Sequence, residues 1–182
     1  MKAGARVLGI DDSPFTEKDE SVLVVGVVWR SGVVEGVLST HVKRDGLDST
    51  KKLEGMVKKS KFRPQLRMIV IHGTTLAGFN IVDLRKLSRS LALPVIAVTK
   101  RKPHAGTVKN ALRNLQDSER RWKLLESAGP VLKIGGLYAH LAGIGSEDAR
   151  KFLSAFGGMP EPVRLAHLIG SGIVRGESHG KV

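Results

Sequence analysis

The stretch Ser21–Trp29 is apolar at nearly every position and reads S-V-L-V-V-G-V-V-W. Valine, a residue that favours strands, fills most of it. Successive side chains of a strand point to opposite faces of the sheet, so a strand that is apolar throughout needs cover on both faces. The stretch therefore predicts a central strand in a sheet that has helices packed on its two sides.

Two further strands are predicted beside it, Ala5–Ile10 before it and Val33–Val42 after the hairpin turn Arg30-Ser31-Gly32. Beyond residue 48 the pattern alternates between helical and strand periodicity. The predicted elements, in chain order, are a helix from Ser49, a strand Arg67–Ile71, a helix Asn80–Leu91, a strand Leu93–Val98, one interrupted or two separate helices over Thr107–Leu115 and Ser118–Ala128, a strand Val131–Tyr138, a helix Ser146–Phe156 and a helix from Pro160 to Ile169. This order is typical of the α/β class, with one mixed sheet that starts as an antiparallel hairpin and continues in βαβ units.

The length of 182 residues suits one domain, which we expect to span residues 1–182 with a frayed tail at 170–182. No apolar run approaches the roughly 18 residues that cross a bilayer, and no signal peptide is legible, so we expect a cytoplasmic protein. The absence of cysteine excludes a disulfide framework, a thiolate metal site and a cysteine nucleophile. Any metal ion must therefore be held by carboxylate and imidazole groups.

The charge balance points to a polyanionic partner. Lys and Arg number 30 against 17 Asp and Glu, which gives a net charge of +13. Between Asp83 and Asp117 there is no acidic residue, whereas a uniform basic shell would interleave acids. A one-sided basic surface indicates nucleic-acid binding. The alternative is an ordinary solvated surface. The residues that we expect to contact nucleic acid are Arg85, Lys86, Arg89, Lys100, Arg101 and Lys102.

Polar residues follow several predicted strands at the point where each strand ends. Asp11-Asp12 follows the first strand, His72 follows Arg67–Ile71, and Lys100 follows Leu93–Val98. The carboxyl ends of strands in an α/β sheet converge on a crevice where ligands bind. Paired carboxylates there suit Mg²⁺ or Mn²⁺, which activates water against a phosphodiester. The alternative for Asp11-Asp12 is a simple turn. Asp45 and Asp48 could add another carboxylate, although a turn followed by an N-cap is the plainer interpretation.

Six short segments together carry a family resemblance. They are Gly9-Ile10-Asp11, Asp45-Gly46-Leu47-Asp48-Ser49-Thr50, Ile71-His72-Gly73, the run from Ala77 to Asp83 (A-G-F-N-I-V-D), the run from Leu93 to Lys100 (L-P-V-I-A-V-T-K), and the run from Pro160 to His167 (P-E-P-V-R-L-A-H). Their order resembles that of endonuclease V, and the second and fourth resemble the hallmark of its archaeal relatives. The resemblance covers nearly the whole chain and implies a ribonuclease-H-like fold.

The resemblance also implies roles for individual residues. Asp11 matches the first metal-binding Asp of endonuclease V, and Lys100 matches its Lys after the fifth strand. His72 stands where the enzyme has its second Asp. The enzyme's Glu has no clean match: an ungapped alignment gives Lys52, and Asp48 and Glu54 lie nearby. The enzyme's catalytic His has no match in register, His140 lying slightly upstream, and its proline-rich wedge is absent.

We therefore expect an endonuclease-V-like nucleic-acid-binding protein with a degraded metal site, and its candidate activity is that of a divalent-metal-dependent phosphodiesterase or endonuclease. Asp11, with Asp12, Asp48 or His72, would hold the metal, and Lys100 would stabilise phosphate charge. Because imidazole is a poor ligand for Mg²⁺, we expect Mn²⁺ to serve better. The alternatives are a non-catalytic nucleic-acid-binding module on the same fold, or a protein that binds a small ligand or a protein partner.

Overall fold

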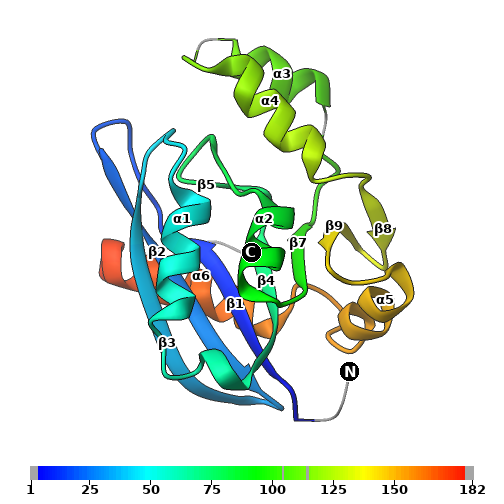
Figure 1. The fold of residues 1–182 in the computed structure, drawn as a ribbon. Coiled ribbons are helices and arrows are strands. Elements are labelled where there is room, and N and C mark those ends of the chain that lie inside the picture. The colour runs from blue at the N-terminus through cyan, green and yellow to red at the C-terminus, as the bar shows by residue number, and fades with distance from the viewer. Residues whose placement is uncertain (1–3, 104, 114, 179–182) are drawn as a thin grey trace.

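A computed structural model of the protein describes residues 4–103, 105–113 and 115–178 (Figure 1). Its main element is a sheet of seven strands in the order β3-β2-β1-β4-β7-β9-β8. The strands are β1 (Arg6–Asp12), β2 (Ser21–Arg30), β3 (Val33–Lys43), β4 (Leu66–His72), β7 (Val95–Thr99), β8 (Leu132–Ile134) and β9 (Leu137–Ala142). A second, two-stranded sheet pairs β5 (Thr75–Leu76) with β6 (Asn80–Ile81).

Three parallel strands form the middle of the main sheet. β4 pairs in parallel with β1 on one side and with β7 on the other, while β2 and β3 continue the sheet as an antiparallel hairpin. β9 joins β7 in the antiparallel direction. The predicted α/β class, with a mixed sheet and a hairpin start, is confirmed. The register aligns Ile10 with Ile71 and Ile71 with Ala97, so the ends of β1, β4 and β7 meet at one edge, which we call the carboxyl edge.

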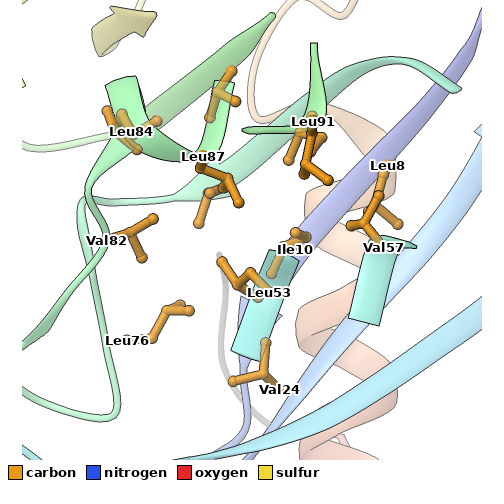
Figure 2. Packing of buried hydrophobic residues seen from close by; sticks show 14 of the residues in the cluster. Leu8, Ile10, Val24, Leu53, Val57, Leu76, Val82, Leu84, Leu87 and Leu91 are labelled. Carbon is orange, nitrogen blue, oxygen red and sulfur yellow. The ribbon is translucent and has the colours of Figure 1, made fainter. Parts of the chain in front are cut away.

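Helices cover both faces of this sheet, as predicted. α1 (Ser49–Lys58) and α2 (Leu84–Leu91) pack on one face (Figure 1). α5 (Ser146–Ser154) and α6 (Glu161–Arg175) pack on the other. Each fully buried Leu or Ile side chain stabilises the fold by about 1.5–3 kcal/mol. Figure 2 shows the first of these cores, in which the labelled side chains are Leu8, Ile10, Val24, Leu53, Val57, Leu76, Val82, Leu84, Leu87 and Leu91.

The helix α6 lies unusually close to β1. A Cβ atom added at Gly9 would stand 2.2 Å from the backbone carbon of Pro162 and 2.5 Å from the backbone nitrogen of Val163. Any other residue at position 9 would therefore hold the helix away from the strand. Val163 and Ala166 are buried against the sheet, so this contact fixes how α6 docks.

The helices α3 (Ala105–Leu112) and α4 (Ser118–Ser127) form a pair that stands off one end of the sheet (Figure 1). A short 3₁₀ helix, η1 (Arg63–Gln65), precedes β4. Among the described helices, none is long and apolar enough to cross a membrane. The cytoplasmic location stays a prediction.

Two predicted elements are wrong in their bounds. The helix expected over Asn80–Leu91 begins only at Leu84, because Asn80 is buried in β6 and its side chain binds the backbone N–H of Ser49. Asp83 is the N-cap and accepts a hydrogen bond from the Lys86 N–H. The strand expected over Val131–Tyr138 is a hairpin, since Gly135, with φ of +59°, starts a turn between β8 and β9.

The expectation of a frayed tail from residue 170 is also wrong for its first part. α6 continues to Arg175 and ends at Gly176, which adopts the left-handed conformation typical of a helix end. Gly170 and Ser171 are buried, because Gly170 lies against Ser13 after β1. The last part of that tail, residues 179–182, lies outside the described residues.

Candidate active site

The carboxylate of Asp11 lies between two imidazole rings at the carboxyl edge. Asp11 is 1% exposed, and its Oδ1 lies 3.1 Å from Nδ1 of His72 while its Oδ2 lies 3.0 Å from Nδ1 of His167. Oδ1 also accepts the backbone N–H of Asp12 at 3.0 Å. An ionised carboxylate only accepts hydrogen bonds, so both imidazoles must donate through Nδ1. The three side chains form one unit, which we call the His–Asp–His group.

The pKa values agree with this arrangement. Burial alone would raise the pKa of Asp11, but the hydrogen bonds from His167 and His72 outweigh it and the pKa is lowered. Burial likewise opposes protonation of His72, yet the bond to Asp11 and its charge raise the pKa of that imidazole. Burial and the neighbouring charge of Asp11 raise the pKa of Asp12 to about 6. Asp11 is therefore the stronger anion of the pair.

The strand register explains why Asp11 and His72 meet. Since Ile10 pairs with Ile71, the next residue of each parallel strand reaches the carboxyl edge at the same level. Lys100 follows the end of β7, which is the next strand along, and is exposed. The structure thus brings Asp11, Asp12 and His72 together and places Lys100 at the same edge.

His167 is the member of the group that the sequence analysis did not select. It lies on α6, where Val163, Ala166 and Gly170 are buried at the spacing i, i+3 and i+7 of a sheet-facing stripe. His167 follows Ala166 and falls within that stripe. A polar residue on an otherwise apolar helix face was a usable signal, but only the docking of α6 along β1 shows what it meets.

Asp48 takes part in a different cluster. Its Oδ1 accepts hydrogen bonds from Nδ2 of Asn80 at 2.6 Å and from the backbone N–H of Lys43 at 3.2 Å. Although Asp48 is the N-cap residue of α1, its side chain makes no capping bond because it turns to Asn80. Asp48 therefore ties together the two hallmark segments, and we leave it out of the proposed metal ligands.

The hallmark segments are locked to each other and reach the active site. Oδ1 of Asp45 accepts the Phe79 N–H at 2.8 Å, and a Cβ atom at Gly78 would stand 2.3 Å from that oxygen. On the other side of the same turn, the Ala77 N–H donates to Oδ2 of Asp12 at 2.7 Å. The two hallmark segments thus form a framework that holds Asp12.

Arg121 of α4 fastens the helix pair to this framework. It is 5% exposed, and its guanidinium donates to the carbonyl oxygens of Gly46, Phe79 and Asp45 at 2.9, 2.7 and 2.6 Å. A further bond reaches the Gln116 carbonyl at 3.2 Å. The planar five-donor head of arginine suits such a set of carbonyls, which a lysine would satisfy only in part.

The predicted nucleic-acid contacts lie on two elements. Lys100, Arg101 and Lys102 are exposed beyond β7 at the carboxyl edge. The remaining three are exposed on α2, which packs on the same face of the sheet as α1; they are Arg85, Lys86 and Arg89. The first set lies next to the His–Asp–His group in the sheet order.

The His and Asp side chains at the carboxyl edge are the candidate ligands for a divalent metal ion. In the parts of the chain that the structure describes, no three His, Asp or Glu side chains are arranged to hold one metal ion. The carboxylates of Asp11 and Asp12 interact at the carboxyl edge, and the imidazoles of His72 and His167 bind Asp11 there. This mixture of nitrogen and oxygen donors fits Mn²⁺ or a later ion better than Mg²⁺. Such an ion would take its other ligands from phosphate and water.

Residues 3–174 match the sequence model of the endonuclease dU family. The chain belongs to this family. A relative from Archaeoglobus fulgidus, a UPF0215 protein, is 46% identical over 179 residues, which cover 97% of each chain. Another UPF0215 protein, from Deinococcus radiodurans, is 36% identical over 97% of this chain and 93% of its own. The archaeal family expected from the hallmark segments is thus confirmed.

Solved structures agree with the fold of this endonuclease dU family member. A crystal structure of a protein from Archaeoglobus fulgidus superposes with a TM-score of 0.88 at 44% identity, covering 96% of this chain and 99% of the other. The catalytic domain of human endonuclease V superposes with a TM-score of 0.59 at 18% identity, covering 95% and 83%. The ribonuclease-H-like fold is confirmed.

Proposed function

We propose that this protein binds DNA and hydrolyses a phosphodiester bond at deoxyuridine, as the name of its family suggests. The His–Asp–His group is the observation that carries the proposal, because a buried carboxylate that orients two imidazoles at a strand edge is a device for moving protons. The endonuclease V of Ciona intestinalis, which shares the fold, is known in complex with DNA that contains inosine. Inosine and deoxyuridine have in common that each carries a deaminated base.

In this proposal Asp11 is the residue that orients the two rings. Its oxygens accept both Nδ1–H groups, which fixes the tautomer and orientation of each ring and makes Nε2 the basic nitrogen of each neutral imidazole. His167 transfers the proton to or from the reacting oxygen. The exposed ammonium of Lys100 neutralises the charge that develops on the phosphate.

Asp12 and His72 are the residues that would hold a divalent ion. Asp11 would orient the His72 ring by accepting a hydrogen bond from its Nδ1. The ion would activate water and polarise the phosphate, and we propose Mn²⁺ in this role ahead of Mg²⁺. The test is single-turnover cleavage of a duplex that contains one deoxyuridine, compared with the same duplex containing thymidine, in Mn²⁺, in Mg²⁺ and in EDTA. We expect cleavage of the first duplex in Mn²⁺.

A second candidate function is nucleic-acid binding without catalysis. The observation that favours it is the small number of carboxylates, since among the described residues no third acidic side chain joins Asp11 and Asp12 in a group that could hold a metal ion. Binding of the deoxyuridine duplex at low salt with no cleavage in either ion would support this second function and contradict the first.

The salt dependence of DNA binding tests whether the basic residues at the carboxyl edge contact phosphates. Replacing Lys100, Arg101 and Lys102 by Ala should lower the slope of log K against log salt by about 2–3, because each phosphate contact contributes about 0.7–0.9. Fluorescence anisotropy of a labelled duplex at several salt concentrations measures the slope. The control replaces an equal number of exposed basic residues away from the carboxyl edge, Lys59, Lys61 and Arg67, and should change the slope little. Equal slopes in the two variants would make the edge an ordinary solvated surface.

The His72→Asp variant tests the choice of ion. A third carboxylate beside Asp11 and Asp12 restores a hard oxygen ligand, so Mg²⁺ should bind about tenfold more tightly than in the natural protein. Isothermal titration with Mg²⁺ and with Mn²⁺ measures this change. His41→Asp, at an exposed position on β3, is the matched control. Identical Mg²⁺ affinity in both variants would place the ion away from His72.

A further inference from the structure

The helix α4 buries a charge and leaves its apolar side chains partly exposed. Arg121 is buried in α4, whereas Trp122, Leu124 and Leu125 are each only partly covered. An amphipathic helix of a globular protein normally presents its apolar stripe to the core and its charges to water. The apolar side chains of α4 are therefore only partly covered by the rest of the protein.

A groove of about 410 Å³ lies between α3 and α4, and Trp122 is one of the residues that line it. Nζ of Lys109, on α3, lies 5.3 Å from the centroid of that ring. Cations outnumber acids among the residues that line the groove, with Lys109, Arg113 and Lys123 against Glu119 and Glu126. An aromatic ring flanked by cations is the arrangement that binds a nucleobase together with its phosphates.

The charge around the groove favours nucleic acid over protein as the ligand. Between residues 100 and 123, the described acidic residues are only Asp117 and Glu119. The exposed cations of the same stretch are Lys100, Arg101, Lys102, Lys109, Arg113, Arg120 and Lys123. In the sequence they extend from the end of β7 through α3 and α4, and this excess of exposed cations favours a polyanionic ligand.

We propose that the groove between α3 and α4 binds an unpaired segment of DNA, with one base stacked on Trp122 and the adjoining phosphates on Lys109, Arg113 and Lys123. The proposal rests on the proposed function only in taking DNA as the substrate. Arg121 joins α4 to Phe79 and Asp45, and the turn that follows Ala77 reaches Asp12. The groove and the active site therefore share one hydrogen-bonded framework, and an unpaired strand held in the first is presented to the second.

The emission of Trp122 gives a direct test. The chain has two tryptophans, so Trp29→Phe leaves Trp122 as the only reporter. The probes are a 12-nucleotide oligo(dT) and a blunt duplex of equal length, added at low salt with EDTA to prevent cleavage. We expect oligo(dT) to quench the emission and the duplex to leave it unchanged. Trp122→Leu should weaken oligo(dT) binding by about 5- to 100-fold, whereas Trp122→Phe, which keeps an aromatic ring, should weaken it by less than about threefold.

The contribution of the Lys109 charge to oligo(dT) binding is tested with two variants that each remove one exposed lysine. Lys109→Met should weaken oligo(dT) binding, and Lys133→Met, at an exposed position on β8, should not. Circular dichroism shows whether Trp122→Leu still folds, and the Phe variant and the quenching remain informative if it does not. Unchanged emission and equal affinity of the variants, with DNA still bound and cleaved, would overturn this inference alone and leave the groove to a protein ligand. No binding of any DNA would overturn the proposed function as well.

Discussion

Asp11→Asn is expected to slow cleavage of the deoxyuridine duplex about a thousand- to ten-thousand-fold with little change in fold. Asparagine offers one acceptor oxygen and one NH₂ donor, so only one of the two Nδ1–H groups that face Asp11 keeps its partner. The other imidazole must turn or change tautomer, and loss of the correct tautomer costs a catalytic histidine about this factor. Single-turnover cleavage rates in Mn²⁺ measure the effect.

Two further observations make this prediction specific. Asp19→Asn, at an exposed loop position, is the matched control and should cleave at the natural rate. In the natural protein, ¹⁵N shifts of His72 and His167 should report a proton on Nδ1 of both rings, and Asp11→Asn should remove it from one. A natural protein with both rings protonated on Nε2 alone, or an Asp11→Asn variant of full activity, would contradict the assigned role of Asp11.

Gly9→Ala is expected to lower the free energy of unfolding by about 3 kcal/mol or more. The added methyl group would meet the backbone of Pro162 and Val163 at 2.2–2.5 Å, and backbone cannot turn aside as a side chain can. Overpacking of this kind commonly costs about 1–3 kcal/mol, and here it also lifts α6, with Val163 and Ala166, away from the sheet. Urea denaturation followed by circular dichroism measures the change.

Gly55→Ala is the matched control for that substitution. Gly55 lies inside α1, and a Cβ atom there would meet no heavy atom within 4 Å other than those of its chain neighbours and of the backbone of its own helix. Alanine should therefore stabilise the protein by about 0.5–1 kcal/mol through its higher helix propensity. If both variants unfolded at the same urea concentration, the close approach of α6 to β1 would have no energetic importance.

The sequence predicted the parts of the fold that local pattern determines. The apolar run at residues 21–29 became a strand buried on both faces, and the strand ends placed Asp11 and His72 at one edge. Prediction failed where distant contacts decide the structure. Asn80 shortens a helix because it is bound by Ser49, and His167 joins the site only because α6 docks on β1. The missed turn between β8 and β9 has a different cause, because the Gly135-Gly136 pair that forms it is itself a local turn signal in the sequence.

The docking of α6 also sets when the active site can form. All strands of the main sheet lie between residues 6 and 142, whereas His167 belongs to a helix that begins at Glu161. A chain emerging from the ribosome can therefore complete its sheet and join Asp11 to His72 before the third member of the group has been synthesised. A nascent or clipped chain that ends before α6 would expose Val25, Val27 and the unpaired oxygen of Asp11. The His–Asp–His group can therefore be complete only after translation has passed α6.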